Sequence, residues 1–285
     1  MRTQDSIIYL DQLEYQQLQS FLGHGPLTSA KYVFMGREEG LGDAGGNNEE
    51  SVHKRLRWYN ELQDCLGHLR QGNNPKWSDG FFIEKPEATV REVVKSLTMY
   101  FQAYAKLVLD SNFTKVKKEI SMGMLKKCMV DTLHVSSGNT AMTELYPLPK
   151  QGKLLYRVEG ESWNEYKRAR DSWENNINNR RQLLNHLYNK YSVPVTICYA
   201  GVEEGNFIAK NFFDNLKFDF TRCTTGIVPE KLKGKVNPSP KPKDIMLGER
   251  NSPLGHQQRV ILTPFWGNGQ MSYDDINVAM AWAVS

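Results

Sequence analysis

The chain has 285 residues, of which 40% are hydrophobic and 24% charged, a composition typical of globular proteins. No apolar run approaches the roughly 20 residues that cross a bilayer, which excludes a transmembrane helix. The formal net charge of +4 permits a polyanionic partner but does not require one.

The cysteines and histidines are scattered along the chain. Cys65, Cys128, Cys198 and Cys223 form no C-x-x-C pair, and no H-x-x-x-H or H-E-x-x-H motif occurs. We therefore expect reduced thiols, no metal site and no other cofactor. The N-terminal stretch MRTQDSIIYLDQ is too polar for a signal peptide, and we expect a cytoplasmic protein.

Helical and strand patterns alternate along the chain. Apolar residues at helical spacing predict helices, and short runs rich in β-branched and aromatic residues predict strands. The predicted elements are, in chain order, a weak helix at 5–22, a strand at 32–35, a helix at 86–110, a weaker strand at 141–147, a helix at 162–191, strands at 193–200 and 259–266, and a helix that begins at Ser272. This alternation predicts an α/β protein, a three-layer sandwich with a central four-stranded, mostly parallel sheet, in one domain over 1–285.

Two predicted loops have unusual compositions. The segment 40–50 is rich in glycine and follows the first strand, so it is either an active-site loop or a flexible connector. The segment 226–250 is rich in proline and lysine, and includes Lys241 and Lys243. It is either a solvated loop or a contact to phosphate.

The residues at the strand ends carry the functional prediction, because ligands of open parallel sheets bind outside the carboxyl ends of the strands. The first strand runs into GREEG at 36–40, which has neither dinucleotide-binding nor P-loop spacing. Its carboxylates suit the activation of water or the stabilisation of a developing positive charge. Surface acids in a turn would give the same local sequence.

In chain order, four strand-end segments resemble those of the uracil-DNA glycosylase superfamily. GREEG takes the place of the motif after the first strand, and NTAMTELYPLPK takes that of the base-reading segment. TICYAGVEEGN takes the place of the phosphate-contacting loop, and ILTPFWGNGQMS that of the last motif. The sequence departs from the family because Glu39 replaces the proline of the first motif and the histidine of the last motif is absent.

The resemblance implies base flipping in duplex DNA and hydrolysis of the N-glycosidic bond. It implies a water-positioning or charge-stabilising role for Glu38, with Asn268 as the nearest replacement for the missing histidine. Contacts to DNA would come from Arg37, Gly201, Lys241 and Lys243. Arg37 could instead pair with a neighbouring glutamate.

Two further assignments stay open at this level. Met271 is either the wedge that fills the gap left by the flipped base or an anchor for the last helix. Phe82, with Phe81, is either a stacking wall for the base or a core residue, and Phe265 and Trp266 present the same choice.

The base-reading residue is either Asn139 or Glu144, depending on the alignment. An asparagine amide would suit the uracil edge. An ionised carboxylate only accepts hydrogen bonds and suits the amino group of cytosine. Strand polarity favours Glu144, and with it a cytosine or modified-cytosine base.

The sequence therefore predicts a DNA glycosylase for a non-standard base, in DNA repair or antiphage defence. A catalytically silent nucleic-acid-binding domain and a nucleoside or nucleotide hydrolase of the same α/β class are the alternatives.

Overall fold

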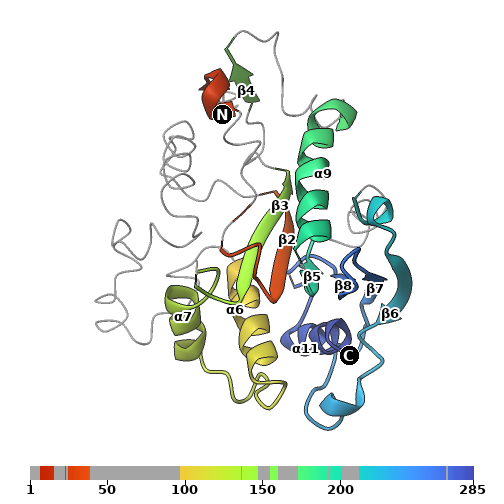
Figure 1. The fold of residues 1–285 in the computed structure, drawn as a ribbon. Helices are drawn as coiled ribbons and strands as arrows, with labels where there is room; N and C mark the ends of the chain where they lie inside the picture. Colours follow the sequence, from red (N-terminus) through yellow and green to blue (C-terminus); the bar gives the residue numbers. More distant parts are fainter. Residues whose placement is uncertain are drawn as a thin grey trace, which may run out of the picture.

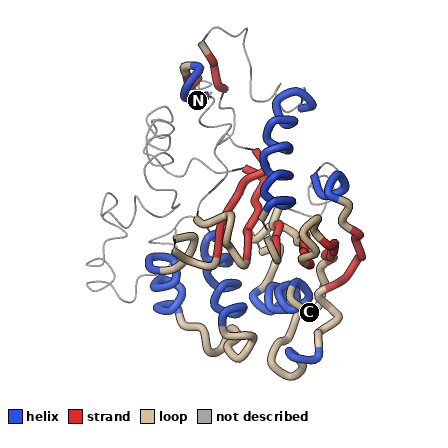
Figure 2. Tube along the Cα trace, in the orientation of Figure 1, coloured by secondary structure: helices blue, strands red, loops and turns tan. Residues whose placement is uncertain are grey.

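A six-stranded mixed sheet forms the centre of the fold (Figures 1 and 2). The computed structural model describes residues 7–15, 23, 25–38, 97–135, 137–146, 155–159, 173–191, 193–200, 212–267 and 269–285. The strand order across the sheet is β3-β2-β5-β8-β7-β6. Its strands are β2 (Tyr32–Glu38), β3 (Thr140–Tyr146), β5 (Val195–Cys198), β6 (Asp219–Thr224), β7 (Asp244–Asn251) and β8 (Gln257–Leu262).

The four predicted strands are confirmed and lie side by side. β3, β2, β5 and β8 are neighbours, and each adjacent pair is parallel. The prediction of a four-stranded sheet is wrong, because β7 pairs antiparallel with β8 and β6 with β7. These two strands escaped the prediction because both carry charged, partly exposed residues in place of a continuous apolar run.

Helices cover both faces of the sheet. On one face, Tyr32 and Phe34 pack in a core with three helices. On the other face, Val33 and Met35 pack in a second core with one helix. The helices of the first face are α6 (Leu97–Asp110), α7 (Met122–Asp131) and α11 (Tyr273–Ala283), and the helix of the second is α9 (Trp173–Lys190).

The helix predictions are confirmed to different degrees. α11 begins after Ser272 as predicted, and a capping box joins the Ser272 side chain to Asp275. α6 and α9 occupy the C-terminal parts of the predicted helices at 86–110 and 162–191, whose first residues lie outside the described part. α7 was not predicted, although Ser121 caps it by accepting from the backbone N–H of Met124.

The predicted N-terminal helix at 5–22 is wrong over its first residues. Strand β1 (Ile7–Leu10) pairs parallel with β4 (Leu155–Val158) in a separate two-stranded sheet. Pairing with a segment far along the chain thus outweighs the weak helical pattern. Among the described helices, none is both long and apolar enough to span a membrane.

Candidate functional site

The side of β2 on which the chain adds strands to the sheet changes between β3 and β5, although β2 and β5 are parallel. After β2 the chain adds β3 on one side of it, whereas β5 and the later strands of the sheet, β6, β7 and β8, all lie on the other side. In open α/β sheets, the crevice outside the carboxyl ends of two such strands is the usual ligand site. The structure therefore directs attention to the last residues of β2, β3 and β5.

Glu144, Gly36 and Tyr199 form a row across these three strands. Gly36 in β2 is paired with Glu144 in β3. On the other side, Met35 is paired with Cys198, which puts Tyr199 beside Gly36. The three residues share the face that α6, α7 and α11 cover, because Tyr199 and Phe34 belong to that core and alternate residues of a strand share a face.

The missing side chain of Gly36 makes room for the carboxylate of Glu144. A Cβ atom on Gly36 would lie 2.2 Å from Oε2 and 2.6 Å from Oε1 of Glu144. From the opposite side, the Tyr199 hydroxyl donates a long hydrogen bond of 3.5 Å to Oε1. Glu144 is half-buried, so a carboxylate is held over bare backbone near the carboxyl end of the sheet.

Aromatic rings continue this row towards β8. The Tyr199 ring stacks on Trp266, with centroids 5.5 Å apart and planes at 30°. Trp266 is fully buried and meets Phe34 edge to face at 6.0 Å. The Thr98 hydroxyl donates to the Trp266 carbonyl at 3.4 Å, which brings the start of α6 to the same place. Tyr199 is 4% exposed and Trp266 0%, so both rings belong to the core behind the carboxylate, and only the half-buried Glu144 is placed to accept a hydrogen bond from a ligand.

The cysteine beside this row is not a nucleophile. Cys198 precedes Tyr199 and is fully buried on the other face of the sheet. Burial raises the pKa of the Cys198 thiol, so it stays protonated at neutral pH, and the thiolate is the reactive form of cysteine. Among the described residues, no group of three or more histidine, cysteine or acidic side chains could hold a metal ion.

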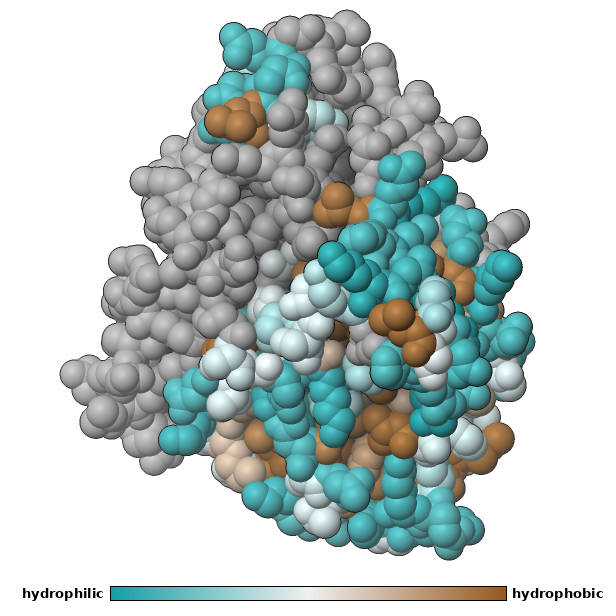
Figure 3. Space-filling view, in the orientation of Figure 1, coloured by the Kyte–Doolittle hydropathy of each residue, from teal (hydrophilic) through white to brown (hydrophobic). Residues whose placement is uncertain are grey.

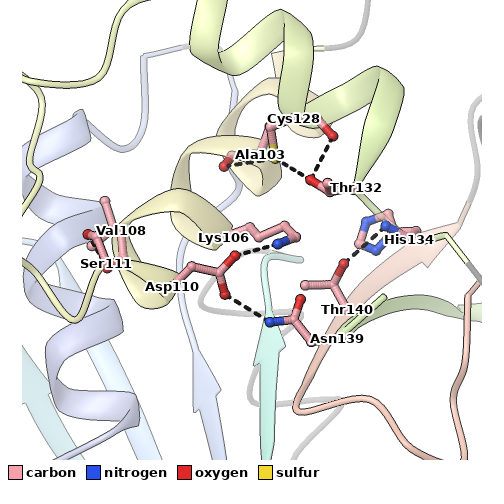
Figure 4. A network of polar contacts seen from close by, with 10 residues as sticks. All are labelled: Ala103, Lys106, Val108, Asp110, Ser111, Cys128, Thr132, His134, Asn139 and Thr140. Atoms are coloured by element: carbon pink, nitrogen blue, oxygen red, sulfur yellow. Dashed lines mark hydrogen bonds and ion pairs between the residues drawn. The ribbon is translucent and has the colours of Figure 1, made fainter. Parts of the chain in front are cut away.

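Asn139 and Glu144, the two candidates for reading the base, lie at opposite ends of β3. Asn139 comes just before β3, and five residues of strand separate the two by about 16 Å. The Asn139 side chain donates to Asp110 Oδ1 at 2.8 Å at the end of α6, where Asp110 also pairs with Lys106 (Figure 4). Asn139 therefore ties α6 to the amino end of the sheet, and only Glu144 lies at the end where ligands bind.

The acidic motif after the first strand is partly inside the strand. β2 continues through Arg37 to Glu38, whose backbone is paired with Tyr146, so the predicted end of this strand at residue 35 is wrong. Glu38 is two residues beyond Gly36, about 7 Å along the strand. The side chains of Arg37 and Glu38 lie outside the described part.

Three other predicted residues, Phe82, Gly201 and Asn268, lie outside the described part of the chain. Met271, in contrast, is only 3% exposed and belongs to the core beneath α6 and α11. In this arrangement it anchors the start of α11, the packing alternative that the sequence left open.

The basic residues of the predicted loop at 226–250 lie in different environments in the structure. Lys243 precedes β7, and the pairing of Met246 with Leu262 puts it at the carboxyl edge of the parallel strands. Lys241 is exposed, Lys243 is half-buried, and neither forms an ion pair within the described part. β7 is three strands from β2, about 14 Å across the sheet, and the two lysines lie just before its first residue.

Arg250 has a structural role. Its guanidinium donates to the carbonyls of Leu216 and Tyr188 at 2.7 and 3.1 Å and to Gln258 Oε1 at 2.7 Å. Burial lowers the pKa of the Arg250 guanidinium. The prediction of a loop over 226–250 is wrong from Asp244 onward, where β7 begins.

Tyr199 is the residue at this site that the sequence did not single out. Alternation in VPVTICYA places it on one face with Val195 and Ile197, but a single sequence contains no signal for the register between β5 and β3.

Comparison of the chain with protein-family models, curated proteins and solved structures gives no match.

Proposed function

We propose that the protein is a DNA glycosylase that removes a base carrying an exocyclic amino group. The observation that carries the proposal is the Glu144 carboxylate over Gly36, beside the stacked rings of Tyr199 and Trp266 at the switch point of the sheet. A carboxylate accepts from an amino group such as N4 of cytosine and repels the O4 of uracil. The buried aromatic pair packs behind the carboxylate and supports it from the core.

In the proposed reaction, Glu38 holds the attacking water. The water oxygen bonds to C1′ of the sugar and gives up a proton, for which the Glu38 carboxylate is the acceptor. The bond between C1′ and the base nitrogen breaks, and the base leaves with the bonding electrons and takes up a proton. A carboxylate near the sugar also stabilises the positive charge that develops on it. The product is an abasic site.

The lysines at the same edge favour DNA over a free nucleoside as substrate. Lys241 and Lys243 precede β7, which is about 14 Å from β2 across the sheet, a span of about four nucleotide steps along one DNA strand at about 3.4 Å per step. A free nucleoside bound over Gly36 would leave these charges unused. A strand that continues on either side of the extracted base brings phosphates towards them.

The test is a cleavage assay on duplex oligonucleotides that carry one uracil, cytosine, modified cytosine or mismatch, followed by alkali, which cuts at abasic sites. We expect cutting at an amino-bearing base by the wild type and not by Glu38→Gln. Glu159→Gln, which changes an exposed glutamate in the separate two-stranded region, is the matched control and should cut normally. Absence of cutting at every base would overturn the proposal, as would base release from nucleosides with the duplexes intact.

A further inference from the structure

Two lysine-rich segments from distant parts of the chain meet at Phe113. The first is the loop 111–121 after α6, and the second is the stretch 230–236 between β6 and β7. The Lys231 ammonium lies 4.5 Å above the centre of the Phe113 ring. The Lys235 ammonium donates to the Phe113 carbonyl at 3.3 Å. We call this region the Phe113 surface, made of Lys115, Lys117, Lys118, Lys231, Lys233 and Lys235.

The Phe113 surface concentrates positive charge. Its two segments contain six lysines and two glutamates, a net charge of +4, which equals that of the whole chain. Both acids are engaged locally: Glu119 accepts from the backbone N–H of Val116 at 2.9 Å, and Glu230 pairs with Lys233. Within the described part of the chain, the other five lysines of this surface form no ion pair. Lys117 lies over the Tyr273 ring, with its ammonium 5.6 Å from the ring centre.

Two features of the Phe113 surface oppose folding: unfavourable backbone angles and the repulsion between its like charges. Phe113 is 1% exposed, and it and Asn112 adopt left-handed backbone angles, with φ of 61° and 47°. Such angles cost on the order of 1–3 kcal/mol each in residues other than glycine. Burial, together with the charge of Arg259, lowers the pKa of Lys231. A partner with regularly spaced negative charges would relieve this repulsion.

The surface is separate from the strand-end site. Phe113 follows the last turn of α6, whereas Thr98, near Trp266, is in its first turn. The 14 residues of α6 span about 21 Å. In Figure 3 hydrophilic residues line the lower edge of the molecule, with hydrophobic patches just above them, and Figure 1 shows the loops below α6 and α11 in this region.

We propose that the Phe113 surface binds the sugar-phosphate backbone of DNA, as a second contact apart from the strand-end site. Long lysine side chains follow a line of phosphates without requiring a fixed geometry. An acidic protein partner fits less well, because protein interfaces centre on exposed apolar anchors. The apolar side chains of these segments are instead buried or partly buried: Phe113, Val116, Ile120 and Leu232 are all below 9% exposure, and Val236 packs partly buried against the same core. This contact goes beyond base removal and does not depend on it.

The test compares two triple variants in full-length protein. Lys115→Gln/Lys117→Gln/Lys118→Gln removes three exposed charges from the Phe113 surface, and Lys31→Gln/Lys190→Gln/Lys217→Gln removes three exposed charges elsewhere. Binding to an unmodified duplex of about 40 base pairs is measured from low to high salt, because each phosphate contact contributes about 0.9 to the slope of log K against log[salt].

We expect the first variant to have a slope shallower by about 2 to 3, and the control to keep the wild-type slope. Equal slopes for all three proteins would overturn the proposal. It would also be overturned if the first variant lost binding to polyglutamate with its DNA slope unchanged, since that result indicates an acidic protein partner. The unmodified duplex makes the measurement independent of base removal, so failure of the glycosylase proposal would appear only in the cleavage assay.

Discussion

The Tyr199 hydroxyl hydrogen-bonds to the Glu144 carboxylate across the bare Cα of Gly36, so two side chains from β5 and β3 meet above β2. This contact connects residues that are far apart in sequence. It makes the position of the carboxylate depend on the tyrosine on one side and on the glycine beneath it.

Gly36→Ala should displace the Glu144 carboxylate, because the new methyl group would lie 2.2 Å from Oε2. Overpacking of this kind costs about 1–3 kcal/mol, which urea unfolding would measure. Base removal should fall at the same time. Gly123→Ala is the matched control, since its Cβ meets only Ser121 Oγ at 3.9 Å and should not destabilise the protein.

The double variant Gly36→Ala/Glu144→Ala tests the cause of this loss. If the clash is with the carboxylate, removal of that side chain restores most of the stability without restoring base removal. A double variant as unstable as the sum of the two single variants would contradict this explanation.

Tyr199→Phe removes the hydroxyl and keeps the ring stacked on Trp266. The lost hydrogen bond is long, so we expect a decrease in the free energy of unfolding of about 1 kcal/mol or less. Because the carboxylate loses its lateral support, kcat/KM for base removal should fall by about tenfold. Tyr104→Phe, which removes a hydroxyl bonded to Asn277 at 3.0 Å inside the core, should affect stability but not kcat/KM.

Glu144→Gln should change the preferred base. A glutamine amide donates as well as accepts, so the O4 of uracil gains a partner. A matched contact to a base edge contributes about 1–3 kcal/mol to discrimination, and we expect the cytosine-to-uracil rate ratio to fall by about 10- to 100-fold. Competition between the two bases in one reaction measures the ratio. An unchanged ratio would show that Glu144 does not face the base.

Arg250→Met should destabilise the fold and leave DNA binding nearly unchanged. It leaves the Leu216 carbonyl without the Arg250 donor and removes one of the two side-chain donors to the Tyr188 carbonyl, which keeps its bond from Gln258 Nε2, at a cost of about 1–3 kcal/mol. Lys241→Gln/Lys243→Gln should do the reverse, with normal urea unfolding and a shallower salt dependence of DNA binding. Similar behaviour of the two variants in both measurements would contradict this division of roles.

Stability should fall in alkaline solution. Burial raises the pKa of Tyr104, Tyr188 and Cys198 above their ordinary values, so the folded protein keeps protons that the unfolded chain releases. Since the unfolded state then binds fewer protons, the free energy of unfolding decreases as pH rises above about 8.5 for the thiol and about 10 for the tyrosines. Each such proton contributes up to about 1.4 kcal/mol per pH unit.

Urea unfolding at several pH values between 8 and about 11 measures this slope. Tyr188→Phe removes one of the groups and should make the slope shallower, despite its lost hydrogen bond to Thr196. A stability that stays constant over this range would contradict the assignment of buried, protonated side chains.

The sequence sufficed to predict the elements with strong local signals. The runs around Ile197 and Ile261 are nearly continuous in apolar residues because both faces of their strands are covered, and the Ser272 cap marks the start of α11. The strands with partly exposed faces, β6 and β7, lack such runs. β1 was missed because its partner is β4, far along the chain.

The same distinction applies to the site. Strand polarity was enough to favour Glu144 over Asn139 as the residue near the ligand, and the structure places the two at opposite ends of β3. The register that brings Tyr199 and Gly36 to Glu144 is a property of backbone pairing between distant strands. No local pattern in one sequence encodes it.

The row of Glu144, Gly36 and Tyr199 also bears on how the protein matures. Its members come from three strand ends separated by long stretches of chain, and it exists only once the β2–β3 and β2–β5 ladders have both formed. Contacts of such high sequence separation form slowly. No fragment that ends before β5 can hold the complete row, so a chain emerging from the ribosome cannot assemble it until most of the chain has been synthesised.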